Sequence, residues 1–190
     1  MPPMSEMPYT TLPAVPESVT ATSVLCRLVD GLSFRYRWAT EGLEDADLAY
    51  RPSDDGMSLG EVMAHIHVLG SWVAASLGAA GRPKGPTYGE VMEGEPAPSE
   101  HDALRRETLA VFARVRGHLE ALGEEGLATV TLTGSLKAEP EPFWCMINGP
   151  LADALTHVGQ VAVWRRALGK PAPRADVFRG NPPRARGATS

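Results

Sequence analysis

The sequence predicts an all-α protein, a four-helix bundle with long connections after the second and third helices. Four long segments carry apolar residues at spacings of three and four, which is typical of helices that bury one face. Capping signals mark several ends of these segments, and the connections between them are rich in glycine and proline. In such a bundle, side chains on facing helices project into a shared core and can meet there.

The first helix is predicted from about residue 17 to residue 41, after an extended, proline-rich lead-in over residues 1–16. Gly42 is placed to end this helix. The second helix has the clearest start signal, because Ser58 and Glu61 match the S-x-x-E capping box. That start fixes the helical register of the residues that follow.

After the second helix, the sequence predicts a long connection, a third helix and a second long connection. Residues 81–98 are dense in glycine and proline, so we expect a surface connection without regular structure. Connections this long are uncommon without a function, so we expect this one to border a pocket. The third helix is predicted from Ser99 to about Leu122, with Gly123 as its stop. Residues 129–133 alternate like a strand, but one strand forms no sheet, so we assign them to a long crossover.

The fourth helix is predicted to begin with Pro150 at its first position and to end at Gly169. The bundle therefore spans residues 17–170, and residues 171–190 form a tail rich in proline, glycine and arginine. At 190 residues the chain has the size of one domain. The chain has two cysteines and no CxxC motif. We therefore do not expect its fold to depend on a disulfide framework or a structural zinc knuckle.

Composition limits the classes of partner. The sequence shows no signal peptide and no run of about 18 apolar residues, so we expect a soluble cytoplasmic protein that does not enter a membrane. The net charge of −5 argues against general nucleic-acid binding. Because six Arg and one Lys against one Asp lie from Arg165 onward, the tail is basic and the rest is acidic. We expect the tail to be solvated or folded over the acidic body; an arm that binds phosphate or nucleic acid is the alternative.

A candidate metal site comes from two helices. Asp153 and His157 lie four residues apart, so their side chains share one face of the fourth helix. His65 lies on the apolar stripe of the second helix and is the expected third ligand. Three ligands would leave positions open on the ion, as in a reactive site. The alternatives are a hydrogen-bonded core histidine for His65 and a helix-dipole role for Asp153. Gln160 is a candidate to orient His157, or an ordinary polar residue.

The remaining histidines, one cysteine, three tryptophans and two arginines are weaker candidates for site residues. We expect His67, His101 and His118 at the surface or on helix flanks, and Cys145 as an ordinary packing residue. Three tryptophans are expected in the core: Trp72, Trp144 and Trp164. Arg165 and Arg166 suit either an anionic substrate or the C-terminal dipole of the helix, and the sequence leaves that choice open.

The segments SLGEVMAH, DALTHVGQ and RRALGKP, with the lead-in LAYRPSDDGMSLGE, resemble the DinB/YfiT-like metalloprotein superfamily over roughly residues 17–170. The resemblance implies that His65 is the ligand from the second helix and that His157 is the second histidine of an approximate H-x-x-x-H-x-G-Q motif. Gly159 and Gln160 match the residues that follow it. Asp153 stands where many members have histidine, which gives two histidines and one carboxylate, a set that binds zinc, nickel, iron or manganese.

The resemblance implies an enzyme that acts on a small-molecule substrate. One chemistry is thiol-S-transfer with bacillithiol or mycothiol as the thiol, and the other is metal-assisted hydrolysis. The alternative function is a non-catalytic helical module that binds a ligand or partner, with His65, Asp153 and His157 as a polar core cluster. A homodimer is a further expectation, which the sequence itself does not show.

Overall fold

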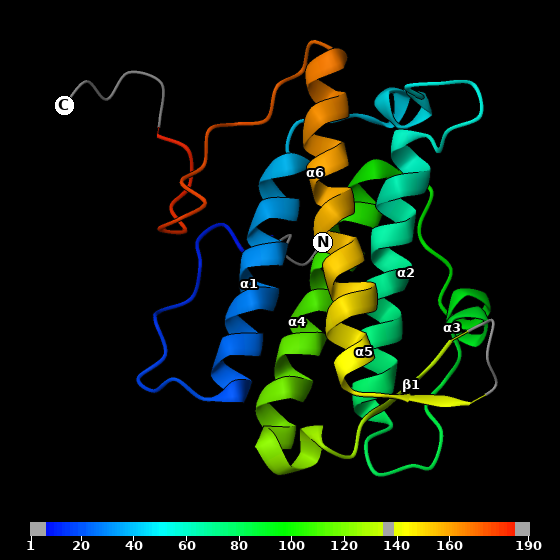
Figure 1. Cartoon of the computed structure of the whole chain (residues 1–190). Helices are drawn as coiled ribbons and strands as arrows, with labels where there is room; N and C mark the ends of the chain where they lie inside the picture. The colour runs from blue at the N-terminus through cyan, green and yellow to red at the C-terminus, as the bar shows by residue number, and fades with distance from the viewer. Residues whose placement is uncertain (1–6, 135–138, 185–190) are drawn as a thin grey trace, which may run out of the picture.

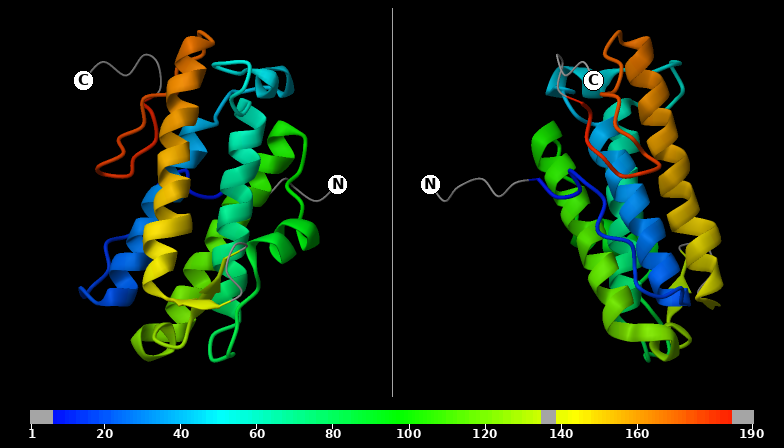
Figure 2. Two further views of the ribbon diagram at one scale, coloured as in Figure 1. Left: turned by 45° about the vertical axis from the view of Figure 1, so that its right-hand side comes forward. Right: turned by 90° about the vertical axis from the view of Figure 1, so that its left-hand side faces the viewer.

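The structure is a computed structural model that describes residues 7–134 and 139–184. Four long helices make up the bundle in Figure 1: α1 (Ala21–Ala39), α2 (Leu59–Gly78), α4 (His101–Leu127) and α6 (Ala152–Ala167). α1 and α2 each pack against both α4 and α6, so the four helices close around one core (Figure 2). α1 and α6 run in one direction, and α2 and α4 run in the other. The predicted four-helix bundle is confirmed.

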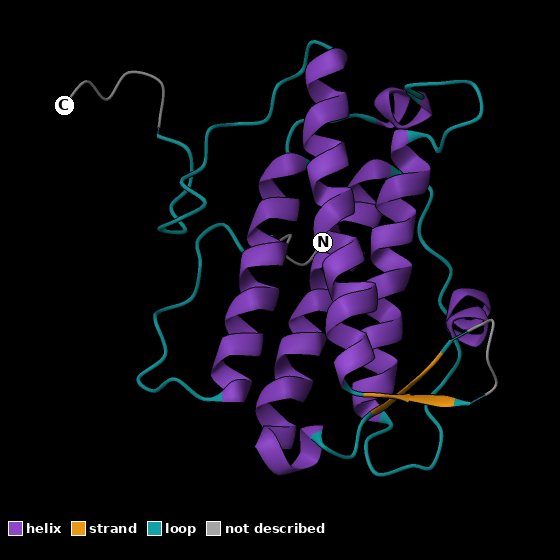
Figure 3. Ribbon diagram, viewed as in Figure 1, coloured by secondary structure: helices purple, strands orange, loops and turns teal. Residues whose placement is uncertain are grey.

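The remaining elements are short and lie in the connections (Figure 3). They are the 3-10 helix η1 (Asp45–Ala49), α3 (Tyr88–Gly94), β1 (Thr131–Thr133), β2 (Pro140–Pro142), α5 (Trp144–Met146) and the π-helical turn η2 (Ile147–Leu151). The predicted long connections after the second and third helices are therefore present, and both carry regular structure of their own.

The connection after α2 contains α3, so the prediction of no regular structure there was wrong. Thr87 forms a capping box with Glu90: the Thr87 hydroxyl accepts a hydrogen bond from the Glu90 backbone N–H, and the Glu90 carboxylate accepts one from the Thr87 backbone N–H. Trp72 of α2 anchors this connection by donating from Nε1 to the Pro86 carbonyl at 3.1 Å. A helix of seven residues is too short to show helical periodicity in the sequence.

The crossover contains a two-stranded antiparallel sheet, which the sequence analysis excluded. Thr131 of β1 pairs with Pro142 of β2, and Thr133 pairs with Pro140. Proline has no backbone N–H to donate, so a segment with two prolines has little strand signal in its sequence. Each strand of a two-stranded sheet is an edge strand, where proline is tolerated, so both prolines are compatible with β2.

The fourth helix begins earlier than predicted. α5 and η2 precede α6, so Pro150 lies within a helical run instead of at its first position. Gly149 interrupts the run with φ −91° and ψ −107°, and the π-helical turn accommodates the missing N–H of the proline. α6 ends at Ala167, and Gly169 follows in the left-handed region at φ +74°, as its predicted stop requires. The helix break predicted at Gly123 is a local one, because α4 resumes beyond it.

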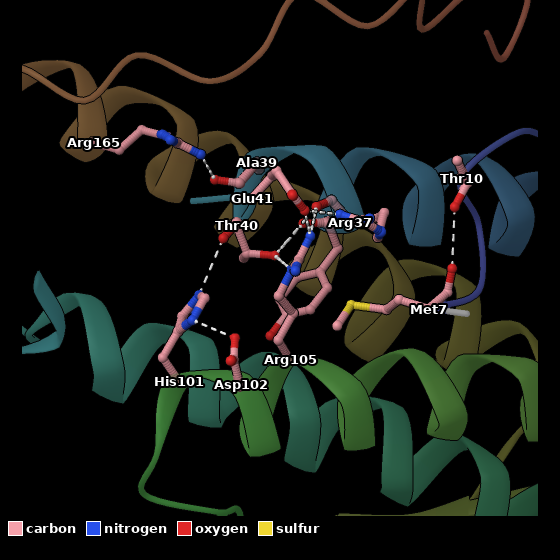
Figure 4. A network of polar contacts seen from close by, with 11 residues as sticks. Met7, Thr10, Arg37, Ala39, Thr40, Glu41, His101, Asp102, Arg105 and Arg165 are labelled. Carbon is pink, nitrogen blue, oxygen red and sulfur yellow. Dashed lines mark hydrogen bonds and ion pairs between the residues drawn. The ribbon is translucent and has the colours of Figure 1, made fainter. Parts of the chain in front are cut away.

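Buried polar side chains close the C-terminal end of α1 (Figure 4). Arg165 donates from Nη1 to the Ala39 carbonyl at 2.7 Å, and His101 Nε2 lies 3.1 Å from the Thr40 carbonyl. Arg105 donates from Nε to the Thr40 hydroxyl at 3.0 Å. The contacts of Arg165 and His101 satisfy carbonyl groups that the helix end leaves unpaired. Arg165 therefore stabilises a helix end. The surface or helix-flank position expected for His101 was wrong, since only 4% of the residue is exposed.

Two other expectations about burial also fail. His67 is 5% exposed and lies 3.3 Å from the Thr108 hydroxyl, because α2 packs against three other helices and buries far more than one stripe. Trp144 was expected in the core, yet 69% of it is exposed, since α5 is a single turn at the edge of the bundle. The apolar stripe therefore predicted the buried face of α2 too narrowly.

The tail folds back onto the lead-in. Leu12 donates its backbone N–H to the Gly180 carbonyl at 3.0 Å. A Cβ at Gly180 would come within 2.3 Å of the Leu12 side chain, and the φ of +72° also requires glycine.

Parts of the predicted lead-in, crossover and tail (residues 1–6, 135–138 and 185–190) lie outside the described residues. In the described part of the chain, none of the helices has the length and apolar character needed to cross a bilayer.

Candidate metal centre

The capping box at the start of α2 fixes the position of the first candidate ligand. The Ser58 hydroxyl accepts a hydrogen bond from the Glu61 backbone N–H at 3.1 Å, and the Glu61 carboxylate accepts one from the Ser58 backbone N–H at 2.6 Å. His65 follows one turn later and faces α6, which packs against α2. The register inferred from the sequence is the register of the structure.

α6 contributes Asp153 and His157 on one face. Asp153 Oδ2 lies 3.3 Å from His65 Nε2, and Asp153 Oδ1 lies 3.3 Å from His157 Nε2. The two imidazole rings lie 4.9 Å apart between centroids and are nearly perpendicular, at 84°. One ligand atom from each of the three residues lies within 4.8 Å of the other two. The structure thus brings together all three residues predicted as metal ligands.

The second nitrogen of each imidazole has its own partner. His157 Nδ1 lies 2.7 Å from Gln160 Oε1, one turn further along α6. His65 Nδ1 lies 3.0 Å from the Tyr88 hydroxyl of α3, and the Tyr88 ring packs edge-on against Trp72 at 5.5 Å between centroids. Burial raises the pKa of Tyr88, and the negative charge of Asp153 adds to this effect. The phenol is therefore a neutral hydrogen-bonding group at neutral pH.

Sequence reasoning identified Gln160 but missed Tyr88. Tyr88 belongs to the connection that was expected to have no regular structure, and a single tyrosine there carries no signal of its own. The T-x-x-E pattern of Thr87 and Glu90 is the signal that was available, because it marks a helix start directly before Tyr88.

The hydrogen bonds indicate which nitrogen of His157 is free. An amide oxygen only accepts, so Gln160 Oε1 accepts a hydrogen bond from the N–H at His157 Nδ1. In the neutral imidazole this leaves an unshared electron pair on Nε2, the atom that faces the Asp153 carboxylate. Two acceptors at that distance repel each other unless a cation or a proton lies between them. This arrangement of partners is the usual one for histidines that ligate metals.

The site is open on the carboxylate side. The Asp153 side chain is 46% exposed, whereas the His157 side chain is 15% exposed. Asp153 lines a cavity of about 450 Å³ between α2, β1 and η2. Apolar walls come from Leu69, Trp72 and Leu132, and polar groups come from Asn148 and Thr156. Asp153 is the one of the three clustered residues that lines this cavity, so a ligand there would reach the cluster at the carboxylate.

The chemistry of the donor set fits a divalent transition metal. Zinc ligands at about 2.0–2.1 Å in a tetrahedron lie about 3.3–3.4 Å apart. Each histidine Nε2 lies 3.3 Å from a different oxygen of Asp153, and one ligand atom of each residue lies within 4.8 Å of the other two. Two imidazoles and one carboxylate occur in catalytic zinc sites and in sites for other first-row metals. His65, Asp153 and His157 are therefore the residues that can hold an ion, and Gln160 and Tyr88 are placed to orient the two rings.

The other histidines do not join this cluster. His67 and His101 are buried in contacts to α4 and α1, respectively. Cys145 lines the cavity of about 450 Å³ but is not one of the three clustered residues. Its Sγ lies 3.8 Å from Glu141 Oε2. The candidate centre therefore consists of the three residues from α2 and α6.

One comparison with known proteins gives a match. The sequence model described as the DinB superfamily matches residues 34–161, about two thirds of the chain, and this span contains all three candidate ligands. No curated protein and no solved structure matches.

Proposed function

The chain belongs to the DinB superfamily, and from this premise we propose that it is a metal-dependent enzyme in which His65, Asp153 and His157 hold one divalent transition metal. We propose that its reaction is the transfer of a low-molecular-weight thiol, such as bacillithiol or mycothiol, to a small electrophilic substrate. The observation that carries the proposal is the convergence of three ligand atoms beside an open cavity.

A metal held by His65, Asp153 and His157 would lower the pKa of a bound thiol or water and so supply a deprotonated nucleophile near neutral pH. The side chains supply the positioning. Gln160 and Tyr88 hold the two imidazole rings, and Asp153 supplies the negative charge that faces the cavity. Trp72 offers an apolar wall and Asn148 an amide that can bind polar groups of the thiol compound.

Thiol transfer is favoured over hydrolysis by what lines the cavity. Among its lining residues, Asp153 and Cys145 are the titratable ones, and Asp153 is a candidate ligand. Hydrolysis of an amide or ester gains from a general acid that protonates the leaving group. A thiol that has lost its proton to solvent attacks an electrophile without such a group. The same lining residues therefore serve the thiol reaction more completely.

The proposal is tested by turnover assays on protein reconstituted separately with zinc, nickel, iron and manganese. Bacillithiol or mycothiol is supplied with an electrophile such as monobromobimane, and ester hydrolysis is followed in parallel. We expect metal-dependent loss of the thiol in wild type and no metal-dependent rate in Asp153→Ala. Asp54→Ala is the matched control, because Asp54 is an exposed aspartate in the connection before α2 and lies outside the cluster.

Thermal unfolding separates the alternatives. If Asp153→Ala keeps its stability and loses the thiol reaction, the site serves catalysis. Hydrolysis without thiol transfer would replace the proposed reaction with the hydrolytic one. If wild type turns over neither substrate class with any metal, and Asp153→Ala loses stability, the cluster is part of a non-catalytic binding module.

A further inference from the structure

A second cavity lies on the other side of α6 from the candidate metal centre. It has a volume of about 830 Å³ and is enclosed by α1, α6 and residues 172–177 of the tail. Figure 2 shows the tail returning along this side of the bundle. Its volume is within the range of about 300–1,000 Å³ that is common for small-molecule sites. We refer to it as the tail cavity.

The lining of the tail cavity combines two kinds of surface. Apolar side chains come from α1 and α6, namely Trp38, Leu155, Val158 and Ala162. Three arginines come from three different segments: Arg35 of α1, Arg166 of α6 and Arg174 of the tail. The lining includes no aspartate or glutamate. The cavity is therefore cationic in a chain whose net charge is −5.

These three arginines have no counter-ion in the described residues, 7–134 and 139–184. Neither an ion pair nor a side-chain hydrogen bond joins Arg35, Arg166 or Arg174 to another group there. Other arginines of the chain are engaged: Arg116, for example, pairs with Asp30 at 3.0 Å. Guanidinium groups that share one cavity repel one another. An oxyanion bound between them would attract all three groups and offset that repulsion.

Trp38 provides an independent observation. Its Nε1 is buried and has no hydrogen-bond partner in the described part of the chain. A buried donor without a partner costs about 1–3 kcal/mol, so such groups usually find an acceptor in a ligand or a water. Trp38 is a lining residue of the tail cavity, so the residue that carries this unpaired donor borders the space that a ligand would occupy.

We propose that the tail cavity binds a small amphipathic anion, an apolar chain that ends in a carboxylate or a phosphate. The apolar residues of α1 and α6 receive the chain, and the three arginines receive the oxyanion. Arginine suits this role because its planar fork of N–H groups matches carboxylate and phosphate oxygens. The site is independent of the candidate metal centre, because the two cavities share no lining residue.

The test is isothermal titration of the full chain with decanoate, decyl phosphate and uncharged 1-decanol, each below the concentration at which it aggregates. We expect decanoate or decyl phosphate to bind with a stoichiometry of one and 1-decanol to bind at least about tenfold more weakly, since it lacks the charge-assisted hydrogen bonds. The tighter of the two anions identifies the headgroup.

Three variants locate the site. Arg35→Ala with Arg166→Ala should weaken anion binding by more than about tenfold, because two charge-assisted contacts are lost. Ala162→Trp, which fills the cavity, should abolish binding of every ligand. Arg106→Ala removes an exposed arginine of α4 outside the cavity and should leave binding unchanged. Circular dichroism and metal content should match wild type in all of them.

Three results would overturn the proposal. The first is that wild type binds neither anion. The second is that the double arginine variant binds decanoate and decyl phosphate as tightly as wild type does. The third is that 1-decanol binds as tightly as both anions, which would make the cavity an apolar groove without a role for its arginines.

Discussion

Gln160 Oε1 lies 2.7 Å from His157 Nδ1, so the other ring nitrogen, Nε2, is the one that faces Asp153. This contact fixes the orientation and the tautomer of the neutral imidazole before any ion binds. We predict that Gln160→Ala weakens metal affinity by about 10–100-fold, the usual effect of removing a partner of a ligating histidine. Competition with a chromophoric chelator measures the affinity.

The control for this prediction is Gln160→Glu, which keeps an oxygen acceptor for His157 Nδ1 and should retain at least the wild-type affinity. Unchanged affinity in Gln160→Ala would show that Gln160 is only a surface polar residue. That was the competing interpretation of the sequence.

Tyr88→Phe tests the contribution of the hydroxyl separately from that of the ring. The variant loses the contact to His65 Nδ1 but keeps the edge-on packing against Trp72. We predict about a tenfold loss of metal affinity with little change in thermal stability, because the ring still fills its place. Tyr88→Leu, which loses the ring as well, should lower both quantities. A Tyr88→Phe protein that binds the metal as well as wild type would remove Tyr88 from the site.

Two glycine substitutions test the packing that places α2. A Cβ at Gly70 would lie 2.9 Å from Val111 Cγ1 and 3.2 Å from Phe112 Cε1, whereas a Cβ at Gly117 would meet nothing within 4 Å. Alanine in place of glycine stabilises a helix interior by about 1 kcal/mol. At Gly70 this gain is opposed by overpacking, which costs about 1–3 kcal/mol.

We therefore predict that Gly70→Ala lowers the free energy of unfolding by up to about 2 kcal/mol, while Gly117→Ala raises it by up to about 1 kcal/mol. Urea denaturation of both variants measures the two values. Equal stabilisation by both substitutions would mean that α2 and α4 do not approach each other this closely.

The stability of metal-free protein should depend on pH through the protonation of His67. Burial lowers the pKa of His67 below its ordinary value of about 6.5. The unfolded state therefore binds this proton first as the pH falls, and the contribution of His67 to stability, complete above about pH 6.5, decreases towards its pKa in the folded state. The advantage of wild type over His67→Gln should shrink across that range. A difference that stays constant, or grows on acidification, would contradict the buried neutral imidazole.

The sequence predicted the four long helices and the proximity of the candidate ligands because both depend on local patterns. The capping box at Ser58 fixes the register of His65, and the spacing of four fixes Asp153 relative to His157. Once α2 and α6 are neighbours in the bundle, these patterns bring the three side chains together. Metal ligation by them remains a prediction.

What the sequence did not predict depends on contacts between distant segments. Tyr88 reaches His65 because α3 packs against α2, and β2 forms because β1 offers it a partner. His67 is buried because helices surround α2 on several sides. The capping pattern of Thr87 and Glu90 marks the start of α3, but the contacts of Tyr88, β2 and His67 with other segments leave no periodic pattern in their own segments.

The most direct measurement is the metal content of protein purified without an affinity tag or chelator, then reconstituted and passed through a desalting column. Wild type and His118→Ala, which changes a histidine outside the cluster, should retain about one transition-metal ion per chain, and His157→Ala should retain almost none. Equal metal content in wild type and His157→Ala, or no metal in wild type after reconstitution, would contradict a metal centre at His65, Asp153 and His157.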